Sequence, residues 1–418
     1  MKKVFIYSAP CYRRDLDAAK TASYFLKNSY KLVYNPKDAD IIVFFTCAIF
    51  NSVVEWSLNK INFFQKCDAR LIVAGCLPEV DGEKLSNIFK GSVISTKTIE
   101  KIDELFPENK YKFSDIEDAN FRWDNYDKSE FETIIKNLID RIPLLNFIIA
   151  ECNSFFIKNY HSGQSHIYIL NSKKPFNIRI GFGCNSNCSY CAIKKAVGTY
   201  KSKQIETCLK EFKKGLNEGY KYFELIADNL GPYGCDINSS LVELLDKITI
   251  IKGDYKLSLV GFDPRWAVKY THEIEKMIKI GKIISLDIPI QSGSRRVLKL
   301  MNRYPNIEKI NEAIHRFSDI THDLHISTQV IIGFPSETEE DFKQTLDFLI
   351  KSEFSTIILL PFSCRTGTAA EGINPKISKE VIFRRMKEAK KALKRNGYLS
   401  KSVKMSNSIW FYKKNCFR

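Results

Sequence analysis

The first hundred residues alternate short apolar runs with amphipathic stretches. Apolar runs lie at residues 4–8, 32–34, 41–46 and 71–75, and amphipathic stretches lie at 15–26, 53–64 and 84–89. Short apolar runs predict buried strands, and stretches with apolar positions three or four apart predict helices. This βαβα order predicts an α/β fold that begins with a doubly wound parallel-sheet domain, with helices on both faces of the sheet.

A second alternating region extends from residue 176 to about 370. It contains six apolar runs, at 178–180, 222–227, 257–260, 283–288, 326–332 and 357–360, with helical patterns between them. Near-continuous apolar runs are typical of parallel strands that are covered on both faces. We therefore expect six βα units in a curved sheet whose site lies at the carboxyl ends of the strands.

The rest of the chain lacks this alternation. Residues 107–175 predict an enlarged linker or subdomain with one helix at 129–141, and the final stretch predicts a basic helical segment. Cys152, His161 and His166 lie in the linker, but they lack the spacing of metal ligands. The predicted domains are 1–106, 107–175, 176–370 and 371–418.

Composition and charge limit the compartment and the partners. Twelve cysteines in 418 residues are too few for a disulfide scaffold. No export signal and no membrane-spanning apolar run is visible, so we expect a cytoplasmic protein without a membrane partner. The net charge is +16, and residues 376–418 carry fourteen Lys and Arg against two Glu. Both a polyanionic partner and a solvated basic helix agree with that tail.

Three cysteines, Cys184, Cys188 and Cys191, follow the first apolar run of the second region. Thiolates are the ligands of iron–sulfur clusters, and three of them leave one iron of a cubane open to a substrate or cofactor. Zinc is the alternative, although structural zinc sites usually close with a second ligand pair that this segment lacks. In a further alternative these are simply buried apolar cysteines, but three of them would then have to fall within eight residues by chance.

Three further cysteines, Cys11, Cys47 and Cys76, each follow a predicted strand of the first region. Carboxyl ends of parallel strands share one edge of a sheet, so these thiols are expected to converge there and hold a second cluster. The alternative is that they are small buried residues of strands, which are common.

The spacing C-x3-C-x2-C, with Tyr190 before the third cysteine, resembles the signature of the radical S-adenosylmethionine (radical SAM) superfamily. The resemblance implies a partial (β/α)6 barrel in which Cys184, Cys188 and Cys191 are catalytic. They would hold a 4Fe-4S cluster whose open iron binds S-adenosylmethionine, and reductive cleavage would yield a 5'-deoxyadenosyl radical.

Within that superfamily the chain looks like a methylthiotransferase. The pairs Pro10-Cys11, Thr46-Cys47 and Gly75-Cys76 match the amino-terminal domain of that family, and matching segments cover most of residues 1–370. The resemblance implies a second, auxiliary 4Fe-4S cluster on Cys11, Cys47 and Cys76 that delivers sulfur to an unactivated carbon. It also implies S-adenosylmethionine used twice, as methyl donor and radical source, and a flavodoxin-like or other low-potential electron donor.

The resemblance further implies a cofactor site formed by Tyr190, Asn229, Gln291, Ser292 and Gly333. Glycine and serine after strand ends allow the backbone to approach a nucleoside closely. A second interpretation explains Gln291 and Ser292 almost equally well, because Ser294 would act as the N-cap of a strand-to-helix turn there.

Departures from the family leave two substrate classes open. The family commonly has His where this chain has Asp287, and Pro where it has Cys364. It usually ends with a TRAM β-barrel, which we expect this chain to lack. Adenosine in tRNA is favoured by the basic tail and by residues 188–198, which most resemble the threonylcarbamoyladenosine-modifying branch.

A polypeptide substrate is the rival class, either a ribosomal protein or a ribosomally made peptide. The expected lack of a TRAM barrel and the enlarged linker favour it. A non-enzymatic iron–sulfur protein that binds RNA or senses redox state would need neither an open iron nor nucleoside-binding turns.

Overall fold

The computed structural model describes residues 1–9, 11–123, 175–403 and 406–413. The chain divides into two compact units. The amino-terminal unit holds Met1–Cys47 and the described residues from Trp56 to 123, and the barrel unit holds Ala48–Glu55 and the described residues from 175 onward. Most of the predicted linker lies outside the described residues, as do its predicted helix at 129–141 and Cys152, His161 and His166.

Five parallel strands form the sheet of the amino-terminal unit, in the order β2-β1-β3-β4-β5. They are β1 (Lys3–Ser8), β2 (Lys31–Leu32), β3 (Ile41–Thr46), β4 (Arg70–Gly75) and β5 (Ser92–Ser95). The winding reverses between β1 and β3, as in flavodoxin-like sheets. The predicted doubly wound parallel sheet is confirmed, and β5 extends it beyond the strands that the apolar runs predicted.

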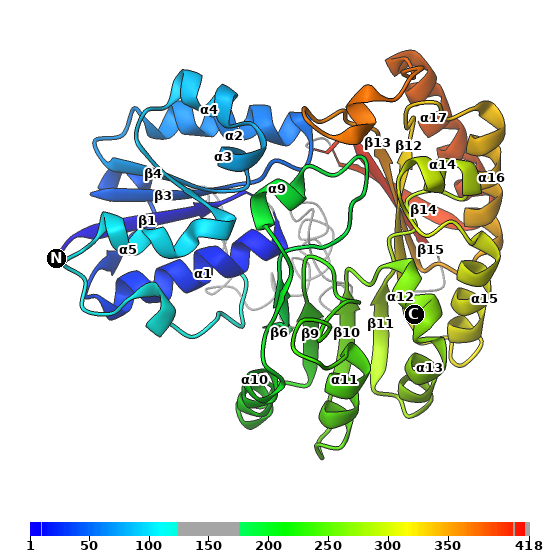
Figure 1. Cartoon of the computed structure of the whole chain (residues 1–418), viewed down its shortest axis with the longest axis horizontal. Coiled ribbons are helices and arrows are strands. Elements are labelled where there is room, and N and C mark those ends of the chain that lie inside the picture. The colour runs from blue at the N-terminus through cyan, green and yellow to red at the C-terminus, as the bar shows by residue number, and fades with distance from the viewer. Residues whose placement is uncertain (10, 124–174, 404–405, 414–418) are drawn as a thin grey trace, which may run out of the picture. The chain divides into compact units, whose positions relative to one another are not determined.

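Alternate residues of β1 face two helical layers (Figure 1). Ile6 packs in the core with Phe25 of α1, whereas Phe5 and Tyr7 point to the other face, where their rings lie 5.9 and 5.7 Å from the ring of Phe64. Because successive side chains of a strand point to opposite faces of the sheet, β1 packs against both helical layers. The helices of this unit are α1 (Tyr12–Lys27), α3 (Leu77–Val80), α4 (Gly82–Ile88), α5 (Ile102–Leu105) and the part of α2 (Asn51–Phe64) that begins at Trp56.

The amino-terminal unit continues past the predicted boundary at residue 106. Phe113 and Ile116 are buried in its core, and the Trp123 indole nitrogen donates a hydrogen bond to the Ile6 carbonyl oxygen at 3.0 Å. The described part of the predicted linker, residues 107–123, is therefore built onto this sheet.

The barrel unit contains six parallel strands that neighbour each other in chain order. They are β6 (Phe176–Arg179), β9 (Tyr222–Ile226), β10 (Lys256–Val260), β11 (Ile283–Asp287), β12 (His325–Ile332) and β13 (Thr356–Pro361). The main connecting helices are α10 (Ile205–Asn217), α11 (Leu241–Thr249), α12 (Pro264–Lys269), α13 (Thr271–Lys279), α14 (Arg295–Leu300), α15 (Ile307–Ser318) and α16 (Glu339–Lys351). The predicted partial (β/α)6 barrel is confirmed.

One face of this sheet is polar. Asn177, Glu224, Ser258 and Ser285 are buried and stand opposite one another across β6, β9, β10 and β11. The residues between them, such as Leu225, belong to the apolar core that the helices complete. The prediction of strands that are apolar on both faces is therefore wrong, because the helices cover only one face of the curved sheet.

The carboxyl-terminal segment is helical only in part. After α17 (Lys379–Arg395), strands β14 (Tyr398–Val403) and β15 (Ser408–Lys413) form an antiparallel hairpin, and β15 pairs with β13. Gly397, at φ 86°, follows the end of α17, and Phe411 stands opposite Ile357 in the core. The prediction of a helical segment over 371–418 is therefore corrected, because the hairpin extends the edge of the barrel sheet. No described helix is long and apolar enough to cross a membrane.

Candidate active site

The cysteines of the C-x3-C-x2-C motif lie on the loop between β7 (Gly181–Phe182) and α9 (Ile193–Val197). Two backbone hydrogen bonds of 3.1 Å shape this loop, from the Cys184 amide to the Gly198 carbonyl and from the Cys191 amide to the Cys188 carbonyl. The segment after β9 supports it, since Asp228 accepts a hydrogen bond of 3.0 Å from the Gly183 amide. The loop is therefore fixed to the carboxyl end of the first two barrel strands.

The end of α14 and the turn that follows it, which come after β11, hold the same loop from a different βα unit of the barrel. The Ser189 hydroxyl donates to the Leu300 carbonyl oxygen at 2.7 Å, and the Ser189 amide donates to the Met301 carbonyl oxygen at 3.0 Å. Asn302 donates from Nδ2 to the Asn187 carbonyl oxygen at 2.9 Å. Three hydrogen bonds thus flank Cys188 on both sides in sequence.

The thiols of this loop lie within electrostatic reach of one another. Burial, together with the neighbouring Cys188 and Cys184, raises the pKa of Cys191 to about 11. Burial also raises the pKa of Cys184, although hydrogen bonds from Ser186 oppose the shift. Both thiols therefore hold their protons at neutral pH without metal, and these protons leave when iron binds.

The donor set fits an iron–sulfur cluster. Three thiols on one loop are soft ligands, and a cubane takes each of them at a different iron. A zinc ion with Zn–S bonds of about 2.3 Å would draw its thiolates to about 3.8 Å from one another. Among the described residues no three or more Cys, His, Asp or Glu are grouped around one such ion position.

The amino-terminal cysteines follow three neighbouring strands. Cys11 is the N-cap of α1, Cys47 directly follows β3, and Cys76 is the N-cap of α3 after β4. Thr46 and Gly75 are paired in register, and the Cys76 amide donates to the Thr46 carbonyl oxygen at 3.0 Å. The predicted position of all three at the carboxyl edge of the sheet is seen, at the point where the winding reverses.

Cys11 and Cys47 are in direct contact. A hydrogen bond from Cys47 lowers the pKa of Cys11 to about 5, with help from the charges of Arg14 and Arg13 and against the effect of burial. The Cys76 sulfur lies 3.8 Å from the Thr96 hydroxyl oxygen. The structure therefore brings Cys11 and Cys47 together and places Cys76 at the end of the adjacent strand.

A pocket of about 150 Å³ in the barrel unit opens beside the cysteine loop. Tyr190 and Cys191 line it together with Gln291, Gln329 and Ser363. Gln291 adopts φ 73°, which is uncommon for a residue with a side chain, and its backbone pairs with Gln329 and Ile331 of β12. Strained backbone of this kind is frequent at functional sites. Two of the five predicted cofactor residues, Tyr190 and Gln291, therefore lie at this pocket.

The other three predicted cofactor residues have structural partners. The Ser292 hydroxyl is fully buried and lies 3.2 Å from that of Thr345 on α16, which agrees with the strand-to-helix turn that Ser294 caps. Asn229 donates from Nδ2 to the Ser186 hydroxyl at 2.9 Å. Gly333, at φ 83°, contacts α17: a Cβ there would lie 2.2 Å from Ile382.

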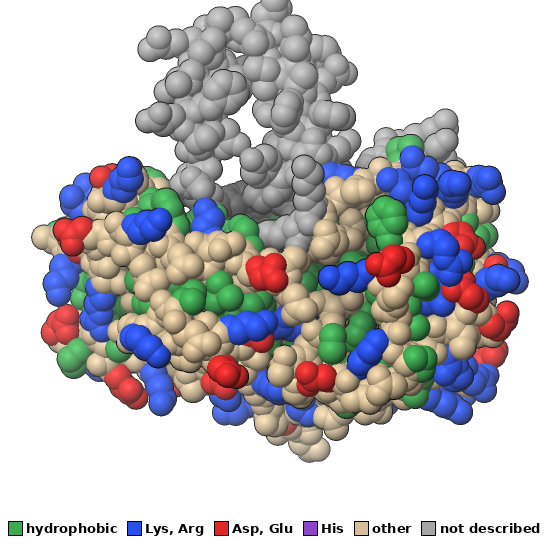
Figure 2. All heavy atoms as spheres, turned by 90° about the horizontal axis from the view of Figure 1, so that it is seen from above, with side chains coloured by type: hydrophobic (Ala, Val, Ile, Leu, Met, Phe, Trp, Pro, Cys, Tyr) green, Lys and Arg blue, Asp and Glu red, His purple; other side chains and the backbone are tan. Residues whose placement is uncertain are grey.

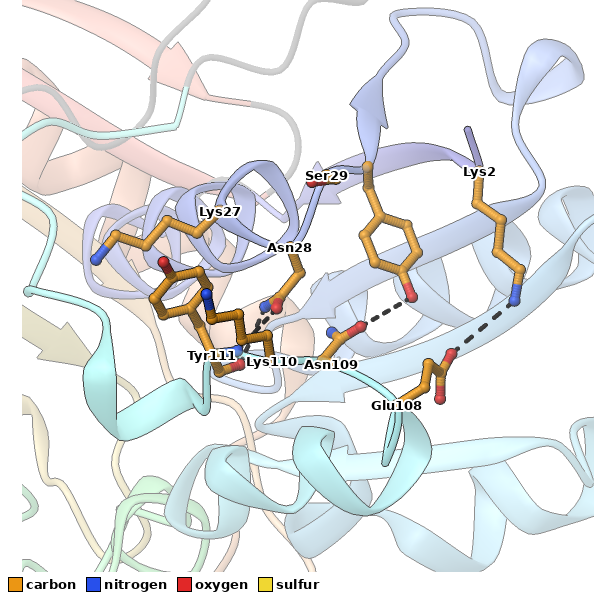
Figure 3. Close-up of a pocket in the computed structure, with 9 residues that line it drawn as sticks. Lys2, Lys27, Asn28, Ser29, Glu108, Asn109, Lys110 and Tyr111 are labelled. Atoms are coloured by element: carbon orange, nitrogen blue, oxygen red, sulfur yellow. Dashed lines mark hydrogen bonds and ion pairs between the residues drawn. The ribbon is translucent and has the colours of Figure 1, made fainter.

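The larger pocket described, of about 600 Å³, lies in the amino-terminal unit away from its cysteines (Figure 3). Lys2, Lys27 and Lys110 line it, and Glu108 lies 4.0 Å from Lys2. Lys2 precedes β1, so the pocket lies at the amino ends of the strands, whereas α/β sheets bind ligands at the carboxyl ends. Size alone therefore does not identify the active site.

Sequence reasoning missed two charged residues at the cysteine loop. Arg303, after α14, donates from Nη1 to the Cys188 sulfur at 3.6 Å and pairs with Asp263 at 2.6 Å. These residues lie 40 positions apart, and no local pattern links them. Their meeting depends on the fold, because Asp263 follows β10 and Arg303 follows the helix after β11.

Two family models match separate parts of the chain. Residues 178–349 match the radical SAM superfamily, and residues 3–95 match an uncharacterized protein family, UPF0004. The first range contains the cysteine loop and most of the barrel, and the second contains the amino-terminal sheet with Cys11, Cys47 and Cys76.

Known proteins resemble the chain over most of its length. A tRNA-2-methylthio-N(6)-dimethylallyladenosine synthase of Thermosipho melanesiensis is 28% identical, over 97% of this chain and 87% of that protein. The ribosomal protein uS12 methylthiotransferase RimO of Clostridioides difficile is 31% identical, over 92% of this chain and 80% of that protein.

A solved structure has the same fold. The radical S-adenosylmethionine methyltransferase TsrM from Kitasatospora setae superposes with a TM-score of 0.58 at 9% identity, covering 88% of this chain and 77% of that one. The fold, the cysteine motif and the 31% identity to a methylthiotransferase agree. The chain belongs to the radical SAM methylthiotransferase family, enzymes that use S-adenosylmethionine and 4Fe-4S clusters.

Proposed function

We propose that this enzyme adds a methylthio group to an adenosine of tRNA and binds two 4Fe-4S clusters through six cysteines. The radical-generating cluster is held by Cys184, Cys188 and Cys191, and the auxiliary cluster by Cys11, Cys47 and Cys76. When bound, the clusters and S-adenosylmethionine supply the radical, the sulfur and the methyl group. The grouping of each cysteine set within one unit supports this assignment.

The chain's own residues position the reactants. Tyr190 and Gln291 line the pocket next to Cys191, and the Gln291 and Gln329 carboxamides offer both donors and acceptors there. A carboxamide pair of this kind suits the amino and carboxylate groups of S-adenosylmethionine. Asn229, through its bond to Ser186, holds the loop rather than the cofactor in this proposal.

The proposal of tRNA as the substrate rests on the exposed face of α17. Lys387, Lys391, Lys394 and Arg395 are exposed along this helix, and Phe383, one turn before Lys387, is 73% exposed. Lysine and arginine side chains neutralise phosphates, and an exposed aromatic ring can stack on a base. A basic stripe with an aromatic residue is therefore the pattern expected of a nucleic-acid surface.

Two other arginines of α17 are already engaged. Arg385 is buried and contacts Glu337 at 2.7 Å and Glu339 at 2.8 Å, and Arg384 contacts Glu339 at 2.5 Å. Arg384 and Arg385 are therefore left out of the proposed RNA surface. Figure 2 shows Lys and Arg side chains side by side on the part of the barrel unit where α17 lies in Figure 1.

The proposal includes a compartment and an electron donor. Cysteine clusters of this kind persist in a reducing cytoplasm, where tRNA is also found. Reduction of the radical-generating cluster needs a low-potential one-electron donor, for which a flavodoxin-like protein is suited.

A polypeptide substrate is the second candidate. The observation that favours it is the 31% identity to RimO, whose name states that it acts on ribosomal protein uS12. The basic tail does not by itself separate the two, since a basic helix can also be merely solvated.

Methylthiolation by the reconstituted enzyme tests the proposal. We expect mass spectrometry to find the added methylthio group on tRNA, and not on purified ribosomal proteins incubated in parallel. Replacing Lys387, Lys391, Lys394 and Arg395 with Gln should weaken tRNA binding and lower the slope of log affinity against log salt by up to about four.

A matched control removes the same number of charges elsewhere. Lys213, Lys252, Lys276 and Lys279 are exposed lysines of the barrel unit, and changing them to Gln should leave affinity and salt slope nearly unchanged. Modification of a ribosomal protein together with unmodified tRNA would replace the tRNA proposal with the polypeptide one.

A further inference from the structure

The cysteine loop contacts a buried arginine that no part of the proposed chemistry uses. The Arg303 side chain is 9% exposed and makes three polar contacts. Nη1 lies 3.6 Å from the Cys188 sulfur and 2.6 Å from Asp263 Oδ2, and Nη2 donates to the Pro289 carbonyl oxygen at 2.7 Å. The guanidinium is therefore fixed from three directions, with one N–H group pointing at a cysteine sulfur.

The local backbone explains this position. Ser294 caps α14, and the helix ends in a tight turn in which Asn302 adopts φ 53°. The Arg303 amide then returns to the Leu298 carbonyl oxygen at 2.8 Å. The same turn bonds the loop residues on both sides of Cys188, so the arginine and the sulfur are held in one rigid element.

The arginine is charged in this setting. A guanidinium group keeps its proton in proteins, and the contact of Arg303 with Asp263 at 2.6 Å pairs this charge inside the fold. Asp263 is also the N-cap of α12, where its Oδ1 accepts from the Arg265 amide at 2.9 Å, so its carboxylate cannot turn away freely. The cation beside Cys188 is therefore balanced by an anion on its far side.

Hydrogen bonds and positive charge at a cysteine sulfur act on the cluster that the sulfur binds. Reduction adds one electron to the cluster, and the reduced form gains more from a nearby donor and cation than the oxidised form does. A buried ion acts strongly because little water screens it. The Arg303–Asp263 pair therefore lies where it can change the reduction potential of the cluster that Cys188 binds.

We propose that Arg303 is a positioning residue that holds Cys188 by a charge-assisted hydrogen bond and raises the reduction potential of the radical-generating cluster, with Asp263 moderating this effect. The inference rests on the proposed assignment of Cys188 as a cluster ligand. The step concerned is the uptake of one electron by the cluster from a low-potential one-electron donor, and no bond forms or breaks at Arg303.

Redox titration tests this, followed by electron paramagnetic resonance. The full chain is reconstituted in a background in which Cys11, Cys47 and Cys76 are changed to Ser, so that only the barrel cluster contributes. In that background we compare Arg303→Met, Arg303→Lys and Asp263→Asn, the last of which keeps the oxygen that caps α12.

The variants should shift the potential in opposite directions. At the wild-type midpoint we expect Arg303→Met to show at least a tenfold lower ratio of reduced to oxidised cluster, equal to about 59 mV for one electron. Asp263→Asn should raise that ratio, and Arg303→Lys should lie between wild type and Arg303→Met. If the ion pair were purely structural, Arg303→Met and Asp263→Asn would both destabilise the fold and leave the midpoint potential of the cluster unchanged.

The outcomes separate this inference from the assignment on which it rests. If changing Cys184, Cys188 and Cys191 to Ser in the same background leaves four irons bound, the ligand assignment and the inference both fail. If that variant is iron-free and the midpoints stay at the wild-type value or move together, only the role of Arg303 is overturned. If Arg303→Met does not hold a cluster, Arg303→Lys and Asp263→Asn still test the inference. The midpoint potential should fall in Arg303→Lys and rise in Asp263→Asn.

Discussion

At the level of single residues, the two cysteine sets lie in opposite electrostatic surroundings. Beside Cys11, a hydrogen bond from Cys47 and the charges of Arg14 and Arg13 outweigh burial, and the pKa falls to about 5. At Cys191 burial dominates and the pKa rises to about 11. Without metal, the amino-terminal unit therefore presents a thiolate at neutral pH, and the barrel unit presents thiols that iron must deprotonate.

The thiolate at Cys11 gives a direct prediction. In the metal-free protein, alkylation of Cys11 by iodoacetamide should rise with pH around a midpoint near 5 and stay level above it. The measurement is the pH dependence of labelling at that residue, followed by peptide mass spectrometry.

Two variants check the cause. Cys11→Ser should abolish the low-pH labelling, and Arg13→Gln should move the midpoint upward, because a nearby positive charge favours the thiolate. A midpoint close to 9, the ordinary value for Cys, would contradict the role given to these neighbours.

Residue by residue, the sequence located the cysteines but not their partners. Spacing alone marks Cys184, Cys188 and Cys191, because ligands on one loop are close in the chain. The Arg303–Asp263 pair left no signal, since its members come from different βα units. Gly333 also has a structural role that its sequence did not indicate: its missing Cβ makes room for Ile382 on α17, a contact that forms only in the fold.

At the level of elements, α17 is bound to the barrel by a buried ion pair. Arg385 and Glu337 have side chains 3% and 0% exposed, and their charged atoms lie 2.7 Å apart. Glu337 also accepts a hydrogen bond of 2.7 Å from the Gly333 amide. Burial nevertheless raises the pKa of Glu337 to about 7, so its charge depends on the arginine.

Removing Arg385 should therefore be costly. We expect Arg385→Ala to destabilise the barrel unit by about 3–5 kcal/mol, because it leaves a buried carboxylate without its cation. The loss should grow as pH rises through about 7, since protonated Glu337 tolerates burial and the carboxylate does not. Thermal unfolding measured below and above that pH gives both quantities.

A neighbouring arginine provides the control. Arg384 and Glu339 are 55% and 47% exposed, so Arg384→Ala should cost less than about 1 kcal/mol and show little pH dependence. Equal losses in the two variants would mean that α17 is not anchored through the buried pair.

The elements themselves were predictable to different degrees. The six barrel strands and β1, β3 and β4 are apolar runs that identify themselves locally. The hairpin β14–β15 was missed because β15 pairs with β13, whose residues lie 50 to 56 positions earlier, from Leu359 with Ile409 to Thr356 with Tyr412. Strands stabilised by such distant pairing carry little of their signal in their own sequence.

At the level of the whole molecule, each proposed cluster belongs to one compact unit. Cys11, Cys47 and Cys76 lie in the amino-terminal unit, and the other three proposed ligands lie in the barrel unit. Each unit has its own sheet and its own apolar core. Loss of one cluster should therefore leave the other unit folded and loaded.

The two triple cysteine variants should therefore lose the same amount of iron but differ in reductive cleavage of S-adenosylmethionine. Anaerobically reconstituted protein should hold about eight irons, and each triple Cys→Ala variant should hold about four. Because only the barrel cluster is proposed to contact S-adenosylmethionine, reductive cleavage should disappear without Cys184, Cys188 and Cys191 and remain measurable without Cys11, Cys47 and Cys76. If the latter variant kept all its iron, the carboxyl edge of the amino-terminal sheet would hold no cluster, and the sulfur would have to enter through the barrel unit.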